Sequence, residues 1–164
     1  MAIRFYVITA SDSGSRGERT DESGPLVRKL CEEAGYEYAG YQMLPDDREK
    51  LSEAMRKICD GQEAELILTT GGTGFAPSDV TPEATKDIIE KETPGIPEAI
   101  RTDSMKYTPR AMLSRAAAGI RKGTLIVNLP GSPKAVGECL EFLLPALQHG
   151  LEILTGSAHE CARK

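Results

Sequence analysis

Short apolar runs alternate along the chain with stretches in which apolar residues recur at helical spacing. Residues 3–9, 66–70 and 124–128 are rich in β-branched and other apolar side chains and predict strands, and residues 37–44 are expected to be extended. The short, continuous apolar run LILTT at 66–70 is typical of a parallel strand that is covered on both faces.

Each predicted strand is followed by a stretch with one apolar helical face. The positions that mark these faces are Leu26, Val27, Leu30, Cys31 and Ala34; Leu51, Ala54, Met55, Ile58 and Cys59; Ala84, Ile88 and Ile89; and Val136, Cys139, Leu140, Leu143 and Leu144. The sequence Thr81-Pro82-Glu83 predicts a helix start with Thr81 as N-cap. Residues 95–112 contain further helix, and Pro145 is expected to kink or restart the last one.

This alternation predicts an α/β domain with a mostly parallel central sheet and right-handed crossovers. The length of 164 residues fits a single domain over 1–164, since no linker or repeat interrupts the pattern. Ligands of such sheets bind outside the carboxyl ends of the strands. Four segments are therefore expected along one edge: residues 11–14, 45–47, 71–74 and 129–132.

Composition excludes several classes of function. The net charge of −5 and the dispersed Lys and Arg residues argue against non-specific nucleic-acid binding. No apolar stretch approaches the roughly 18–20 residues that span a bilayer, and the N-terminal residues do not resemble a secretory signal. We therefore expect a cytoplasmic protein without a membrane role, whose four cysteines stay reduced. These are Cys31, Cys59, Cys139 and Cys161.

The turn Gly71-Gly72-Thr73-Gly74 is the sharpest candidate for ligand binding. Glycines allow positive φ and close backbone approach, and consecutive amides with the Thr73 hydroxyl can cradle phosphate oxygens. The turn lacks the lysine of a Walker A loop and the spacing of a dinucleotide fingerprint. A glycine-rich turn that serves only tight packing is the alternative, and the position after a buried strand favours the ligand.

A second anion site is predicted where Ser132-Pro133 opens the last helix, because a helix N-terminus presents unpaired amides and positive potential. Lys134 adds charge there. The alternative is a well-capped helix that binds no ligand.

Three aspartates are candidates for catalysis. Asp46 and Asp79 are expected beside the glycine turn, where two carboxylates and substrate phosphates would hold Mg²⁺, and Asp12 joins them or binds the ligand. Two structural alternatives remain. Asp46 precedes Glu49 by three residues and could be a helix N-cap, and Asp79 could merely favour a helix start.

Both histidines, His149 and His159, fall late in the chain and are expected on the surface, so a histidine base is not predicted. A phosphomonoester needs no such base, because its second pKa is about 6 and it is already an anion.

Five motifs in family order resemble the MogA/MoaB-type molybdopterin-binding family. They are SDSGSRG at 11–17, TTGGTG at 69–74, DVTPEAT at 79–85, SR at 114–115 and NLPGSPK at 128–134. The resemblance implies a three-layer α/β/α sandwich that transfers AMP from ATP to the terminal phosphate of molybdopterin and releases pyrophosphate. It also implies homo-oligomers, as trimers or hexamers.

The resemblance assigns roles by position. Asp46 and Asp79 match the essential aspartates that hold Mg²⁺, and Ser11, Asp12 and Ser13 match the loop beside the nucleotide. The molybdopterin-binding positions are Gly71, Gly72, Thr73, Gly74, Ser114, Asn128, Pro130 and Gly131.

The chain lacks the inserted segment of the longer MogA-type enzymes between NLPGSPK and the C-terminus, and in this it resembles the compact MoaB-type branch. A non-catalytic molybdopterin-binding protein is therefore the main alternative to the adenylyltransferase. A gephyrin-like scaffold module and a pyridine-nucleotide pyrophosphatase are weaker alternatives.

Overall fold

Six strands form one sheet in the computed structural model, which describes residues 2–157. The strands are β1 (Arg4–Ala10), β2 (Glu37–Leu44), β3 (Leu66–Thr70), β4 (Lys91–Glu92), β5 (Ala118–Arg121) and β6 (Thr124–Leu129). Their order across the sheet is β2-β1-β3-β6-β5-β4.

The four strands predicted from the sequence lie side by side and run parallel. Strand β5 pairs antiparallel with β6, and β4 pairs antiparallel with β5. The prediction of a mostly parallel sheet is confirmed. The carboxyl ends of β1, β2, β3 and β6 consequently share one edge, which we call the carboxyl edge; it comprises the residues that follow Ala10, Leu44, Thr70 and Leu129.

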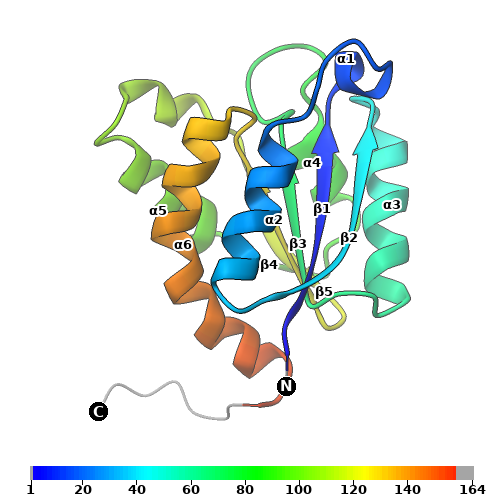
Figure 1. Ribbon diagram of the computed structural model, residues 1–164, viewed down its shortest axis with the longest axis vertical. Helices are drawn as coiled ribbons and strands as arrows, with labels where there is room; N and C mark the ends of the chain where they lie inside the picture. The colour runs from blue at the N-terminus through cyan, green and yellow to red at the C-terminus, as the bar shows by residue number, and fades with distance from the viewer. Residues whose placement is uncertain (1, 158–164) are drawn as a thin grey trace.

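Helices cover both faces of the sheet, and Figure 1 shows the resulting three layers. The helices are α1 (Asp12–Ser15), α2 (Ser23–Glu33), α3 (Arg48–Asp60), α4 (Thr81–Lys86), α5 (Gly95–Ser104), the 3₁₀ helix η1 (Pro109–Leu113) and α6 (Pro133–Leu154). Helices α2, α5 and α6 form one layer, and α3 and α4 form the other. The short helix α1 lies at the carboxyl edge (Figure 1).

Two apolar cores follow from this layering, one on each face of the sheet. The alternating side chains of β1 divide between them, since Phe5 and Val7 pack beneath α2 and α6 whereas Ile8 packs beneath α3. In β3, Leu66 and Leu68 belong to the first core and Ile67 to the second. Burial on both faces explains why this strand reads as a continuous apolar run.

The structure corrects three local predictions. Strands β4 and β5 lie in segments where no strand was predicted. Helix α6 continues through Pro145 without a restart, although proline cannot donate the usual helical hydrogen bond, and the alternative of a kink at Pro145 stays a prediction. Helix α4 begins one residue earlier than expected, with Val80 as its N-cap and Thr81 as its first residue.

Among the helices of residues 2–157, none combines the length and the apolar character needed to cross a membrane.

Candidate active site

The loops that follow β1 and β2 are joined at the carboxyl edge. The Ser11 N–H donates to the Leu44 carbonyl at 2.9 Å, which ties the two strand ends together. The Ser11 hydroxyl caps α1 by accepting from the Gly14 N–H at 3.0 Å. Ser13 lies within this turn, with its hydroxyl oxygen 3.4 Å from that of Ser11. The predicted nucleotide-side residues thus form one capped turn rather than an open loop.

Asp12 and Asp46 hold each other in place. The Asp12 N–H donates to Asp46 Oδ2 at 3.1 Å, and the Asp46 N–H donates to Asp12 Oδ1 at 2.8 Å. The N-cap of α3 is the neighbouring Asp47, which accepts from the Lys50 N–H at 2.9 Å. The capping alternative for Asp46 is therefore wrong, and the Asp46 carboxylate instead accepts a hydrogen bond from the loop that follows β1.

The second oxygen of Asp46 has no partner. Asp46 Oδ1 is a buried atom without a hydrogen bond to any described residue, and the same holds for the hydroxyl oxygen of Thr81. A Cβ at Gly72 would lie 3.3 Å from Asp46 Oδ1 and 2.3 Å from Thr81 Oγ1. Two unsatisfied oxygens therefore flank Gly72, where a buried polar atom normally requires a partner.

The charge of Asp46 is costly in this position. Burial raises its pKa, and the negative charges of Asp12 and Asp79 raise it further, although the hydrogen bond from the Asp12 N–H opposes the shift. Asp79 is thus close enough to act on Asp46 electrostatically. A group that supplies positive charge between these carboxylates would relieve both the repulsion and the missing hydrogen bond.

Asp79 faces the other end of the glycine turn. A Cβ at Gly74 would lie 3.0 Å from Asp79 Oδ2, and the same oxygen accepts from the Ala76 N–H at 3.0 Å. Asp79 is half-buried. The two predicted aspartates therefore both face the turn, one beside Gly72 and one beside Gly74.

The conformation of the turn requires glycine. Gly71 and Gly72 have φ values of 86° and 70°, in the left-handed region that other residues adopt only at a cost. A Cβ at Gly71 would lie 2.6 Å from the Ala10 carbonyl oxygen. The turn consequently packs directly against the end of β1, and its backbone approaches its neighbours more closely than a side chain permits.

These residues fit a divalent cation. No group of three or more His, Cys, Asp or Glu side chains able to hold a metal occurs within residues 2–157. A pair of carboxylates with an unpartnered oxygen and mutual repulsion suits a hard cation such as Mg²⁺, which takes one or two carboxylates and completes its shell with water and substrate phosphates.

A cavity of about 510 Å³ opens beside the glycine turn, on the side of α2 and α6. Its lining residues come from the ends of β1, β2 and β3, from α1, from residues 19–23 and from residues 131–133. The predicted site residues that line it are Ser11, Gly71 and Gly131, together with Ser132 and Pro133 of the predicted anion site. The helices α2 and α6 both begin at this cavity. The Ser132 hydroxyl caps α6 by accepting from the Ala135 N–H at 3.2 Å, as the capped-helix alternative predicted.

The sequence did not reveal that residues 19–23, which precede and begin α2, line this cavity. Asp21 Oδ1 accepts from the first N–H groups of α2, at Ser23 and Gly24. Its other oxygen accepts from the hydroxyls of Thr9 and Tyr41 at 2.7 and 2.6 Å. Arg19 lines the same wall and supplies a positive charge. No periodicity marks this segment, because it is a loop fixed by side-chain hydrogen bonds.

The predicted molybdopterin-binding residues outside the glycine turn, which we call the pterin-side residues, are Ser114, Asn128, Pro130 and Gly131, and Asn128 differs from the other three in its burial. Ser114 is half-buried, and its hydroxyl accepts from the Ala116 N–H at 3.3 Å. Pro130 and Gly131 follow β6 at the edge, and a Cβ at Gly131 would lie 3.4 Å from Gly71 Cα. Pro130 and Gly131 thus lie at the carboxyl edge, and Ser114 precedes Arg115, whose backbone N–H donates to the Thr73 carbonyl of the glycine turn.

Asn128 differs from the other predicted pterin-side residues. It is only 1% exposed. Its amide accepts from the Ala117 N–H at 3.0 Å and donates to the hydroxyls of Thr69 and Thr85 at 3.0 and 2.9 Å. Both amide hydrogens are thereby used, so in this structure Asn128 joins β3, α4 and the start of β5 and presents no donor to a ligand.

His149 is exposed on α6, as expected, and His159 lies outside the described residues. Cys31, Cys59 and Cys139 are buried, unpaired thiols, and Cys161 also lies outside the described part of the chain.

The fold and the site define a small α/β protein with a cavity and a pair of aspartates at the carboxyl ends of its parallel strands. Comparison with known families identifies it further. The family model described as "Probable molybdopterin binding domain" matches residues 6–149, and the chain belongs to this family.

Individual relatives agree with this assignment. The chain is 41% identical over 158 residues to a molybdopterin adenylyltransferase from Helicobacter pylori, covering 94% of this chain and 89% of that protein. It is 44% identical to the molybdenum cofactor synthesis protein cinnamon of Drosophila melanogaster, of which it covers only 26%. The crystal structure of the molybdopterin biosynthesis enzyme MoaB from Thermus thermophilus superimposes with a TM-score of 0.89 at 44% identity, covering 94% of this chain and 97% of that one.

Proposed function

We propose that this chain is a molybdopterin adenylyltransferase, which acts in molybdenum cofactor biosynthesis. It transfers AMP from ATP to the terminal phosphate of molybdopterin and releases pyrophosphate. The 41% identity to a relative of that name, over 94% of this chain, supports the activity. The observation within the chain that carries the proposal is the pair of carboxylates, Asp46 and Asp79, that faces the two ends of the glycine turn.

In the proposed reaction an oxygen of the molybdopterin phosphate forms a bond to the α-phosphorus of ATP, and the bond from that phosphorus to the bridging oxygen breaks as pyrophosphate leaves. The nucleophile is already anionic, so no proton must be removed by the protein. The contribution of the chain is to bring two phosphorylated molecules together and to stabilise charge in a fixed geometry.

Asp46 and Asp79 are the residues that would hold Mg²⁺ in this proposal. Bound there, the ion neutralises charge that develops on the reacting and departing phosphates. The unpartnered Asp46 Oδ1 and the electrostatic coupling between the two aspartates support this role. Asp12 acts on the site indirectly, because it fixes the backbone and carboxylate of Asp46.

The remaining residues divide between the two substrates. We assign the glycine turn, Gly71–Gly74, to the terminal phosphate of molybdopterin, because it lies at the carboxyl edge beside the aspartate pair and because turns of this kind bind phosphate oxygens. Ser114, Pro130 and Gly131 form the pterin side. Ser11, Asp12 and Ser13 lie on the nucleotide side, and the cavity beside them is large enough for part of a substrate.

The activity is tested by incubating the protein with ATP, Mg²⁺ and molybdopterin and measuring adenylylated molybdopterin. Asp46→Asn and Asp79→Asn should each abolish transfer while molybdopterin binding, measured by titration calorimetry, is largely kept. Asp60→Asn is the matched control, because Asp60 pairs with Arg121 at the end of α3 away from the carboxyl edge. Retained turnover in both site variants would disprove the assigned role of the aspartates.

A molybdopterin-binding protein without catalysis is the competing hypothesis. It predicts that wild-type protein binds molybdopterin but neither ATP nor a non-reactive ATP analogue, with or without Mg²⁺. The same titrations therefore separate the two functions.

We further propose that the chain forms a homo-oligomer, a trimer or hexamer. Two large apolar side chains, Phe75 and Met112, are 71% and 60% exposed and would be covered in an assembly. Light scattering after size-exclusion chromatography tests this, and a monomer at micromolar concentration would contradict it.

A further inference from the structure

Arg115 connects the glycine turn to a segment far away in sequence. It lies between η1 and β5, and its backbone N–H donates to the Thr73 carbonyl at 2.8 Å. Its side-chain Nε donates to the Gly74 carbonyl at 2.7 Å. One residue thereby fixes two consecutive carbonyls of the turn.

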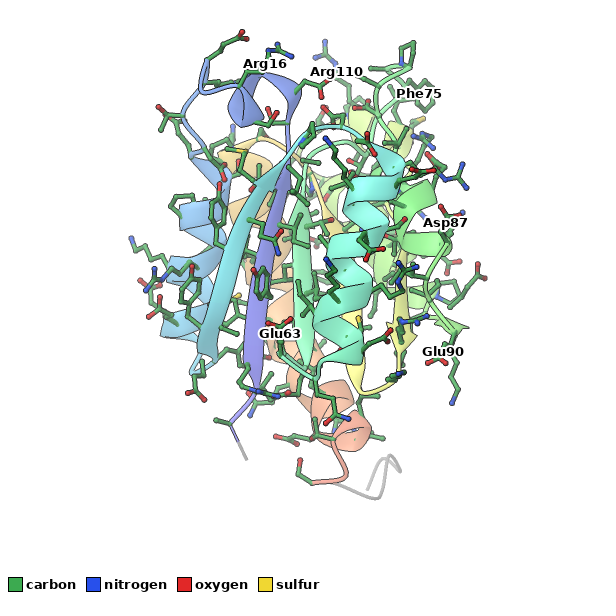
Figure 2. The ribbon with its side chains drawn as sticks, turned by 90° about the vertical axis from the view of Figure 1, so that its right-hand side faces the viewer. Arg16, Glu63, Phe75, Asp87, Glu90 and Arg110 are labelled. Atoms are coloured by element: carbon green, nitrogen blue, oxygen red, sulfur yellow. The ribbon has the colours of Figure 1, made fainter. Side chains whose placement is uncertain are left out.

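The same guanidinium reaches Asp79. Arg115 Nη2 donates to the Asp79 carbonyl at 2.9 Å. Gly74 and Asp79 are the two ends of an exposed excursion, residues 75–78, so Arg115 closes the base of this loop. Figure 2 shows Phe75, in the loop, at the same end of the molecule as Arg16 of the β1 loop. Residues 75–78 of the loop are exposed, and Arg115 bonds the carbonyls of the two residues that flank them, Gly74 and Asp79.

The third nitrogen of the guanidinium connects Arg115 to helix α4. Arg115 Nη1 lies 2.9 Å from both carboxylate oxygens of Glu83, in the first turn of α4. All three guanidinium nitrogens thus have protein acceptors. Arg115 is consequently not arranged to bind a substrate phosphate, and its geometry is that of a side chain that holds other groups in place.

We propose that Arg115 is a positioning residue for the cation site, which sets the Asp79 carboxylate against the glycine turn. This inference rests on the proposed function, in which Asp79 holds Mg²⁺. The turn needs such support because Gly71 and Gly72 have no side chains with which to fix their own conformation. A hydrogen bond from the Thr81 N–H to the Gly72 carbonyl, at 3.2 Å, supports the other side of the turn.

The principal test is Arg115→Gln, which removes the positive charge and most of the donors. Loss of a residue that orients a metal ligand typically costs about 10–100-fold in metal affinity or activity. We expect kcat to fall by that factor. KM for molybdopterin should rise as well, because Arg115 also bonds the Thr73 and Gly74 carbonyls of the turn that we assign to the molybdopterin phosphate. Excess Mg²⁺ should partly restore the rate.

A second readout does not depend on turnover. Binding of Mn²⁺, measured by electron paramagnetic resonance in the presence of a non-reactive ATP analogue, should weaken by the same factor of about 10–100. Arg121→Gln is the matched control, since Arg121 also bonds a carboxylate and a carbonyl, those of Asp60 and Ile88, at the opposite end of β5. It should keep the wild-type kcat and Mn²⁺ affinity.

Two further variants cover the case in which Arg115→Gln does not fold. Arg115→Lys keeps the charge but offers a single nitrogen, which cannot reach three separate acceptors. It should lose Mn²⁺ affinity and kcat together. Glu83→Gln weakens only the anchor on α4 and should produce a smaller loss in the same direction.

The possible results are distinct. Wild-type kcat and Mn²⁺ affinity in the Arg115 variants would overturn the inference, as would an equal loss in Arg121→Gln, which would indicate general destabilisation. If Asp79→Asn remains fully active, the proposed role of Asp79 fails, and the Arg115 inference fails with it. An inactive Asp79→Asn beside an unaffected Arg115→Gln removes the Arg115 inference and leaves the proposed function intact.

Discussion

Replacement of Gly72 by alanine measures how tightly the glycine turn packs beside the two unpartnered oxygens. The new Cβ would lie 2.3 Å from Thr81 Oγ1, 3.2 Å from Thr81 Cβ and 3.3 Å from Asp46 Oδ1. The first distance is shorter than any tolerated contact, so Thr81 or the turn must move. The φ of 70° adds backbone strain for any residue with a Cβ.

The two costs can be separated with a control at Gly35. Positive φ costs a residue with a Cβ about 1–2 kcal/mol, and a side chain forced into a packed site costs about 1–3 kcal/mol more. Gly35 has a φ of 92°, and no atom lies within 4 Å of the position that a Cβ would occupy, so Gly35→Ala bears only the first cost. Gly72→Ala should therefore be the less stable variant by about 1–3 kcal/mol.

Urea denaturation followed by circular dichroism measures this difference, and the adenylylation assay measures its effect on the site. Gly72→Ala should markedly lower the rate because it displaces the Asp46 oxygen, whereas Gly35→Ala should keep the wild-type rate. Adding Thr81→Ala to Gly72→Ala removes the closest atom and should recover part of the stability. Equal free energies of unfolding for the two single variants would refute the close packing at Gly72.

Three further predictions concern the rest of the fold. Burial raises the pKa of Glu65, but hydrogen bonds from Arg4 lower it more, so its pKa in the folded protein lies below the ordinary value. This carboxylate therefore stabilises the fold at a pH above its unfolded pKa. The stabilisation is lost as the pH falls through the folded pKa. Glu65→Gln should accordingly cost about 1 kcal/mol at pH 7 and progressively less below about pH 4.3, and a loss that is independent of pH would contradict this. Burial raises the pKa of Cys31 to about 12 and that of Cys59 to about 11, so peptide mapping after iodoacetamide treatment at about pH 8 should find both thiols unmodified in native protein and modified in urea. Asn128→Ala removes three buried hydrogen bonds, and it leaves the Ala117 N–H and the Thr69 hydroxyl without the partner they have in wild type, while the Thr85 hydroxyl still donates to the Thr81 carbonyl. It should lower the free energy of unfolding by about 2–4 kcal/mol, and a loss below about 1 kcal/mol would show that those two groups find other partners.

The apolar runs predicted β3 and β6 because these two strands are buried on both faces, and burial selects apolar and β-branched residues. Strand β2 lies at the edge of the sheet without a buried residue, and its segment 37–44 was expected only to be extended. The common edge of four loops then followed from parallel topology alone, which is why the glycine turn and Asp46 could be placed near each other from the sequence.

Strands β4 and β5 could not be predicted in this way. Strand β4 consists of two exposed, charged residues, Lys91 and Glu92, which carry no apolar pattern. Strand β5 contains Gly119, where a Cβ would lie 2.5 Å from Ile89 Cδ1 and 2.7 Å from the Lys91 carbonyl oxygen. Its pairing depends on close contacts with residues distant in sequence, and local propensity does not encode them.

The sequence indicated which candidate residues share the carboxyl edge, but not the hydrogen bonds that hold them there. Asp46 and Asp47 are adjacent, and the sequence alone could not tell which one caps α3; the hydrogen bond from the Lys50 N–H decides for Asp47. Arg115 lies within the quoted SR motif, yet its contacts reach residues 32 to 42 positions earlier in the chain, through carbonyls that no side-chain pattern reveals.

The central claim is that Asp46 and Asp79 together hold a divalent cation beside the glycine turn. Crystals grown with Mn²⁺ and a non-reactive ATP analogue test it most directly, because anomalous scattering locates the ion without reference to activity. The account predicts one Mn²⁺ within coordination distance of both carboxylates and of the analogue's phosphates. An analogue bound at the carboxyl edge with Mn²⁺ contacting neither aspartate would contradict it.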